Sequence, residues 1–146
     1  IGIFYYPLFN IPSLSKKIAF ISPLKGSTFR VSSKFGYRIH PVYKTKKFHG
    51  GIDLAAPINT PVYSVKAGVV IQSGFVRGYG NYIVIEHEDG YKSAYAHLKT
   101  INVKKGEKVD CEIVIGSVGK TGTATGYHLH FELIKSNKKI DPKFLI

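Results

Sequence analysis

The sequence predicts a mainly β domain of compact antiparallel strands with few short helices, and three observations lead to this prediction. Short runs rich in β-branched and aromatic residues are separated by Gly, Asn and Asp along most of the chain. An Asp-Gly pair stands between two of these runs, as in tight hairpins. Long amphipathic helical patterns are not evident. The length of 146 residues suits one compact domain.

The first 20 residues are predicted to be an N-terminal arm or the remnant of an upstream region. Pro7, Pro12 and the polar run 13–17 interrupt this stretch, and neither helical nor strand periodicity persists in it. Its apolar opening, residues 1–9, is far shorter than the roughly 20 residues of a membrane-spanning helix. We therefore expect the folded domain to occupy residues 21–146, with no transmembrane segment in this chain.

The strands expected in this domain follow one another closely in the second half of the chain. The runs with strand character are 69–71, 82–85, 91–98, 113–115 and 128–134. Between the second and third of them stands Glu88-Asp89-Gly90, and Asp-Gly readily adopts the positive φ angles of a tight hairpin turn. The two runs should therefore be adjacent antiparallel strands.

The composition points to an anionic partner. Lys and Arg number 21 against 9 Asp and Glu, which gives a formal net charge of +12. Nucleic acid, a membrane surface and an acidic cell-wall polymer all satisfy this charge. The single cysteine, Cys111, excludes an intramolecular disulfide and any zinc site made of several cysteines, and we expect it to be a structural thiol.

A histidine and an aspartate lie four residues apart in His49-Gly50-Gly51-Ile52-Asp53. In an extended strand their Cα atoms would be about 13 Å apart, too far to share an ion whose ligand bonds are about 2 Å. The chain must curl between them. Glycine has no Cβ to forbid left-handed or strained backbone angles, so Gly50-Gly51 is expected to permit that curl.

A second pair of histidines lies in His128-Leu129-His130, inside the last strand run. Alternation places His128 and His130 on one face, roughly 7 Å apart, with Leu129 on the other. On the run 91–98, alternation places Tyr91, Ser93, Tyr95 and His97 on a common face, so that His97 can point at the same centre.

Together these residues offer the donors of a catalytic zinc site. Two histidines and one carboxylate around zinc leave a fourth position for water, and the ion lowers the pKa of that water to about 7. Each pattern alone carries little information, but their coexistence predicts a hydrolase.

From about Pro23 to Glu132 the chain resembles the lysostaphin-type zinc metallopeptidases, which are peptidoglycan endopeptidases. The resemblance rests on five motifs and on their order and spacing along the chain. The motifs are Phe35-Gly36-Tyr37-Arg38-Ile39-His40-Pro41, His49-Gly50-Gly51-Ile52-Asp53, Gly78-Tyr79-Gly80-Asn81, Tyr95-Ala96-His97-Leu98 and His128-Leu129-His130-Phe131-Glu132.

The resemblance implies an antiparallel β domain of this family, related to the duplicated hybrid motif, with an active-site groove. It implies that His49, Asp53 and His130 bind one Zn²⁺ and that His97 and His128 are the catalytic histidines. Which of the two acts as the base stays open at this point.

Three further residues receive expectations of their own. His40 falls in the family's Arg-x-His-Pro stretch and is expected to be structural or to line the groove. His87, outside the motifs, is expected to be a solvated strand histidine. Tyr43, six residues before His49, is a candidate donor to the oxyanion. Tyr127 departs from the family, many of whose members have Pro at this position.

The implied substrate is the stem or cross-link peptide of bacterial peptidoglycan, either a glycine bridge or a cross-link with D-amino acids. Such a substrate implies an extracytoplasmic location in the periplasm, the cell envelope or outside the cell, and the positive charge suits anionic envelope polymers. The alternative within the family is an inactive relative that regulates cell-wall amidases, but all five matched positions are retained here.

Two unrelated functions are less well supported. A nucleic-acid-binding β domain would use the charge and the 10 Tyr and 9 Phe residues for stacking, but it leaves the histidine set unexplained, so no nucleic-acid partner is expected. Gly119-Lys120-Thr121 resembles the end of a phosphate-binding loop, but Val114 replaces the glycine required five residues earlier.

Overall fold

The structure is a computed structural model that describes residues 20–27, 29–39 and 42–146. The predicted arm, residues 1–20, therefore lies outside the described residues except for Phe20. From Phe20 onward the chain already packs on the domain, because the Phe20 ring contacts Tyr91 and the Ile21 amide donates to the Val65 carbonyl at 2.8 Å. Leu24 is fully buried.

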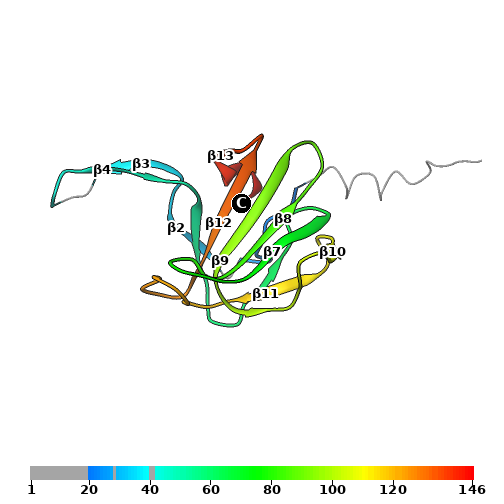
Figure 1. The fold of residues 1–146 in the computed structure, drawn as a ribbon. Coiled ribbons are helices and arrows are strands. Elements are labelled where there is room, and N and C mark those ends of the chain that lie inside the picture. Colours follow the sequence, from blue (N-terminus) through cyan, green and yellow to red (C-terminus); the bar gives the residue numbers. More distant parts are fainter. Residues whose placement is uncertain (1–19, 28, 40–41) are drawn as a thin grey trace, which may run out of the picture.

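The described residues form antiparallel strands and one short 3-10 helix, as the sequence predicts (Figure 1). The strands are β2 (Arg30–Ser33), β3 (Gly36–Ile39), β4 (Lys46–His49), β5 (Ile52–Ala55), β6 (Pro61–Tyr63), β7 (Gly68–Val76), β8 (Gly80–Glu86), β9 (Tyr91–Ile101), β10 (Lys108–Val109), β11 (Val114–Val118), β12 (His128–Lys135) and β13 (Lys138–Ile140). The helix η1 spans Pro142–Leu145. None of the helices within the described ranges has the length and apolar character to cross a membrane.

The main sheet has the strand order β10-β7-β8-β9-β12-β5-β2, with β11 paired to β6 and β9, and β13 paired to β12. β3 and β4 form a separate two-stranded sheet, which projects to the left of the main sheet in Figure 1. This topology places β12 between β9 and β5. Three chain segments that are distant in sequence therefore lie side by side in the middle of the sheet.

The hydrophobic core lies on the face of these central strands opposite to the histidines. Tyr95 of β9 pairs with Phe131 of β12, and their rings pack with centroids 5.4 Å apart. Leu129 and Leu133, each two positions from Phe131, are also fully buried. The alternation predicted for the last strand is thus confirmed, and it fixes β12 with its apolar face inward.

The five predicted strand runs correspond to β7, β8, β9, β11 and β12. The predicted hairpin joins β8 to β9, and Asp89 and Gly90 adopt φ angles of 61° and 78°. The sequence did not predict the other seven described strands, β2, β3, β4, β5, β6, β10 and β13, because each is only two to four residues long and too short to show a periodic pattern.

His87 is buried, so the expectation of a solvated histidine was wrong. It is 6% exposed, its Nδ1 donates to the Ala67 carbonyl at 2.8 Å, and its Nε2 lies 2.7 Å from the Ser93 hydroxyl. Ser93 in turn contacts the Tyr95 hydroxyl at 2.8 Å. A buried polar chain of this kind stays stable only because each member has a partner. Cys111 is a buried free thiol, as predicted.

Candidate active site

The site is centred on the carboxylate of Asp53 at the start of β5. One of its oxygens, Oδ1, lies 3.4 Å from Nε2 of His49, 2.7 Å from Nδ1 of His130 and 3.9 Å from Nε2 of His128. The His97 ring completes the group, with its centroid 4.9 Å from that of His128. The structure thus brings together all five residues that the sequence singled out.

The curl between His49 and Asp53 is present, but the reason for its two glycines differs from the expected one. Neither glycine has a positive φ, so neither needs the left-handed region. A Cβ at Gly51 would lie 2.5 Å from the Phe131 carbonyl oxygen, and one at Gly50 would lie 2.8 Å from Cδ of Lys139. Position 51 therefore requires glycine because the link between β4 and β5 passes directly over the backbone of β12, whereas at Gly50 only the flexible Lys139 side chain would have to move.

β12 supplies two histidines by simple alternation. His128 pairs with Ala55 and His130 with Asp53 on β5, while Leu129 points into the core. Since directly paired residues share a face of the sheet, the pairing sets His130 beside the Asp53 carboxylate. This part of the sequence prediction is confirmed.

His97 reaches the site in a way that alternation did not predict. Ile83 pairs with Tyr95 and Asn81 with Leu98, so β9 advances three residues where β8 advances two. This β-bulge coincides with a φ of 62° at His97, a conformation that is uncommon for a residue with a Cβ. Tyr95 consequently lies in the core while His97 faces the other histidines, and the expected common face of Tyr95 and His97 was wrong.

Each of the four histidines forms a hydrogen bond between a ring nitrogen and a protein oxygen atom. The acceptors for Nδ1 are the carbonyls of Lys34 for His49 (2.8 Å), Thr121 for His97 (2.8 Å) and Gly126 for His128 (3.0 Å). For His130 both nitrogens face a carboxylate, Nε2 that of Glu132 at 2.8 Å and Nδ1 that of Asp53 at 2.7 Å. Because a carbonyl oxygen only accepts, Nδ1 of His49, His97 and His128 carries a proton, and Nε2 of each neutral ring keeps its lone pair.

Burial and hydrogen bonding set the protonation of the site. Burial acts to raise the pKa of Asp53, but the hydrogen bonds with His130 and His49 outweigh it and hold that pKa well below its usual range. Burial acts to lower the pKa of His130, yet its hydrogen bonds to Asp53 and Glu132 raise it to about 9. Burial lowers the pKa of His97, so this imidazole is neutral at pH 7.

The residues fit a zinc ion. One donor atom from each of His49, Asp53 and His130 lies within 4.8 Å of the others. Two imidazole nitrogens and a carboxylate oxygen are donors that zinc accepts, and ligand bonds of about 2.1 Å would space them by about 3.4 Å in a tetrahedron. The separation of His49 Nε2 from Asp53 Oδ1 is 3.4 Å. A cation bound to Nδ1 of His130 would replace the proton shared with Asp53.

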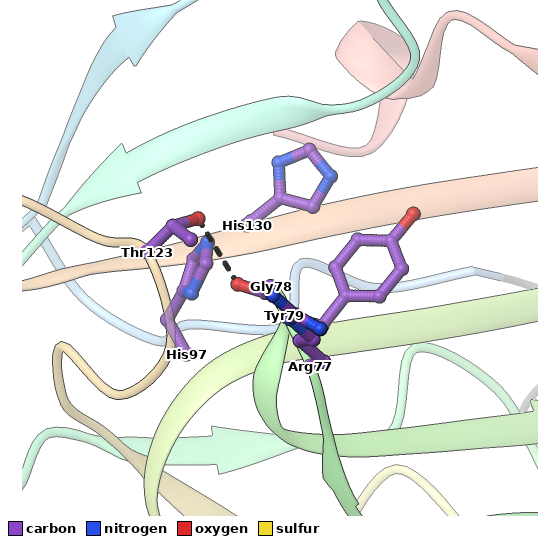
Figure 2. Close-up of a pocket in the computed structure, with 6 residues that line it drawn as sticks. All are labelled: Arg77, Gly78, Tyr79, His97, Thr123 and His130. Atoms are coloured by element: carbon purple, nitrogen blue, oxygen red, sulfur yellow. Dashed lines mark hydrogen bonds between the residues drawn. The ribbon is translucent and has the colours of Figure 1, made fainter.

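An open pocket of about 370 Å³ lies beside these donors. It is lined by Arg77, Gly78, Tyr79, His97, Thr123 and His130 (Figure 2). The Thr123 hydroxyl donates to the Gly78 carbonyl at 3.1 Å, which ties the 121–126 loop to the turn between β7 and β8. The pocket opens onto the rings of His97 and His130.

Sequence reasoning missed three residues that the structure adds to the site. Glu132, Tyr79 and Lys139 form a hydrogen-bonded group behind His130. Only Glu132 carried a usable signal, because it follows His130 by two residues on the same strand and therefore shares its face. His40 lies outside the described residues. Tyr43 lies between β3 and β4 with 75% of its surface exposed, and its role at the oxyanion stays a prediction.

A His-Asp-His donor set with two more histidines beside it is typical of a catalytic zinc site, and with the antiparallel β fold it indicates the class of zinc metallopeptidases. The chain belongs to Peptidase family M23, whose family model matches residues 47–142. This match includes all five residues of the site.

Several of the relatives are named as peptidoglycan endopeptidases or zinc peptidases. The chain is 46% identical over 116 residues to the peptidoglycan DD-endopeptidase ShyA of Vibrio cholerae, covering 79% of this chain and 27% of that protein. A crystal structure of a zinc-containing peptidase from Vibrio cholerae superposes with a TM-score of 0.80 at 42% identity, covering 86% of this chain and 39% of the other. The catalytic domain of lysostaphin from Staphylococcus simulans gives a TM-score of 0.70 at 29% identity, covering 83% of this chain and 98% of the other. The chain thus spans about a quarter of the length of ShyA.

Proposed function

We propose that this chain is a zinc-dependent endopeptidase that hydrolyses peptide bonds in the stem or cross-link peptides of bacterial peptidoglycan. The observation that carries the proposal is the approach of His49, His128 and His130 to one oxygen of Asp53, with the His97 ring packed against that of His128. Membership of Peptidase family M23 supports the reaction class, and ShyA, by its name a peptidoglycan DD-endopeptidase, supports the substrate class.

In this proposal His49, Asp53 and His130 hold one zinc ion. When bound, zinc would polarise the scissile carbonyl and acidify a water molecule. The protein contributes the orientation of the donors, since the Lys34 carbonyl holds Nδ1 of His49 and leaves Nε2 directed at Asp53. Glu132 acts in the same way on His130, whose Nδ1 then faces Asp53.

His97 and His128 are the proposed catalytic histidines. Each donates Nδ1–H to a backbone carbonyl, so that Nε2 is the nitrogen able to take up a proton. Because burial lowers the pKa of His97, its Nε2 is free to accept a proton from water at pH 7. His128 lies nearer to Asp53 and is suited to stabilise the oxyanion or to return a proton to the leaving amine. In this division of roles, His97 is the general base.

The proposal includes an extracytoplasmic location, because peptidoglycan lies outside the cytoplasm. The net charge of +12 suits contact with anionic envelope polymers. We assign the peptidase domain to residues 21–146, in agreement with the packing of Ile21 and Leu24 on the sheet.

The test combines metal content with cleavage. The purified chain is loaded with zinc, its metal is quantified by elemental analysis, and the release of new amine ends from purified peptidoglycan is followed with and without a chelator. We expect about one zinc per chain and cleavage that the chelator abolishes and zinc restores. Mass spectrometry of the released peptides then identifies whether a glycine bridge or a D-amino-acid cross-link is cut.

Variants assign the roles. Asp53→Asn should lose zinc and activity together, whereas His128→Ala should keep zinc and lose turnover. Glu86→Gln, at an exposed carboxylate of β8, is the matched control and should behave as wild type. A zinc-loaded chain that cuts no peptidoglycan but stimulates a cell-wall amidase would instead identify the regulatory alternative.

A further inference from the structure

Glu132 is a buried carboxylate directly behind the proposed metal site. It is 3% exposed, and a single one of its oxygens, Oε2, accepts hydrogen bonds from Nε2 of His130 at 2.8 Å, the Tyr79 hydroxyl at 3.1 Å and Nζ of Lys139 at 3.3 Å. An unpartnered buried carboxylate is costly, so the three donors keep it in this position.

The hydrogen bond from His130 determines which of its nitrogens is available to a metal. Both ring nitrogens of metal-free His130 face a carboxylate, Nε2 that of Glu132 at 2.8 Å and Nδ1 that of Asp53 at 2.7 Å, and each donates a hydrogen bond. A cation would replace the proton on Nδ1, while Glu132 keeps the proton on Nε2. A carboxylate on the far nitrogen also makes an imidazole a more basic ligand. Without Glu132 the ring could bind its proton on either nitrogen and rotate.

Tyr79 holds the Glu132 carboxylate in place from the pocket side. Its ring stacks on Tyr82 with centroids 4.5 Å apart and planes 6° from parallel, which fixes the direction of the hydroxyl. Figure 2 shows the Tyr79 ring beside the His130 ring, with its hydroxyl pointing away from Gly78. The Tyr79 carbonyl accepts the His97 amide at 2.8 Å. This residue therefore touches both halves of the site, His97 through its backbone and His130 through Glu132.

We propose that Glu132, held by the Tyr79 hydroxyl, is a positioning residue that sets the affinity of the His49–Asp53–His130 site for zinc without touching the ion. The inference rests on the proposed function, since it assumes that these three residues bind the metal. Lys139 is the third partner of the carboxylate, and its side chain reaches Glu132 across Gly50, where a Cβ would collide with it.

The experiment measures zinc affinity by competition with a chromophoric chelator, so it needs no turnover. Glu132→Gln keeps the shape of the side chain and removes its charge. We expect the dissociation constant for zinc to rise by about 10- to 100-fold, the usual effect of losing such an outer partner. The absorption spectrum of the cobalt-substituted protein should change as well, because the orientation of one ligand is altered. A wild-type affinity and an unchanged cobalt spectrum in Glu132→Gln would overturn the proposal.

Tyr79→Phe tests the proposal where Glu132→Gln fails to fold. It removes the hydroxyl that contacts Glu132 and keeps the ring contacts with Tyr82 and His130. It should weaken zinc binding by a smaller factor than Glu132→Gln does. Tyr82→Phe is the matched control and should bind zinc as wild type does. In the Glu132→Gln background, Tyr79→Phe should cause no further loss, because its effect passes through the carboxylate. An equal loss in Tyr79→Phe and Tyr82→Phe, or full additivity with Glu132→Gln, would contradict the proposed link.

The outcomes also separate this inference from the proposed function. If wild type cuts no peptidoglycan but Glu132→Gln weakens zinc binding, the inference stands and the proposed activity fails. If Asp53→Asn binds zinc as tightly as wild type, the metal site is elsewhere, and the inference fails regardless of cleavage.

Discussion

The close packing of Gly51 against β12 makes a single methyl group a sharp test of how the site is assembled. A Cβ at this position would lie 2.5 Å from the Phe131 carbonyl oxygen, 2.9 Å from Cγ of Glu132 and 2.9 Å from Cε1 of His130. Two of these atoms belong to side chains of the site, and the third is backbone in the middle of the sheet. Gly51→Ala therefore forces either the β4–β5 link or β12 to move.

The size of the effect follows from these distances. Contacts under 3.0 Å against a backbone atom are not relieved by a side-chain rotation, so the cost should resemble that of overpacking a core, about 1–3 kcal/mol. For a chain of this length that corresponds to a fall in Tm of roughly 2–12 °C. Because His49 and Asp53 flank the link, zinc affinity should fall together with stability.

The assay is chemical denaturation of the metal-free protein, followed by chelator competition for zinc. Gly126→Ala is the matched control, because a Cβ at Gly126 meets nothing within 4 Å and its φ is not in the left-handed region. Gly126→Ala should leave the free energy of unfolding and the zinc affinity unchanged, although the Gly126 carbonyl accepts a hydrogen bond from His128. If Gly51→Ala equals Gly126→Ala in stability and zinc affinity, the argument from close packing is refuted.

Three more predictions concern catalysis, pH and the core. His97→Ala should retain zinc and lose about 10²- to 10⁴-fold in turnover on peptidoglycan, as expected for a proton-transfer group; unchanged turnover would exclude His97 as the base. Burial lowers the pKa of His87 below 6.5, so the unfolded chain binds a proton that the folded chain does not. The stability of the metal-free protein should therefore decrease as the pH falls below about 6.5, and urea titrations should show a smaller decrease in His87→Gln. Equal pH dependence in the two proteins would assign the acid sensitivity to other groups. Phe131→Ala should cost about 3–5 kcal/mol in the same unfolding assay, because the fully buried ring leaves a cavity beside Tyr95, and a loss below about 1 kcal/mol would contradict its place in the core.

Local patterns in the sequence determined much of the fold and the membership of the site. Period-two alternation placed His128 and His130 on one face of β12 and Leu129 on the other, and the structure agrees. Asp89-Gly90 marked the β8–β9 hairpin through its own backbone preferences. The motif spacing also singled out the five residues that meet at Asp53. The alternation and the hairpin turn depend on neighbours within a few positions, which is why one sequence suffices to predict them, whereas the set of five residues came from the resemblance to a family.

The tertiary structure alone decided how those residues meet. His130 and Asp53 are 77 positions apart, and their contact exists because β12 pairs with β5 in one particular register. The bulge that turns His97 toward the site is a mismatch between β8 and β9, invisible in either strand alone. Gly51 is required by β12 passing beneath it, and His87 is buried by its contacts with Ala67 and Ser93. Strand register, bulges and close approaches arise between segments far apart in the chain, so only their packing fixes them.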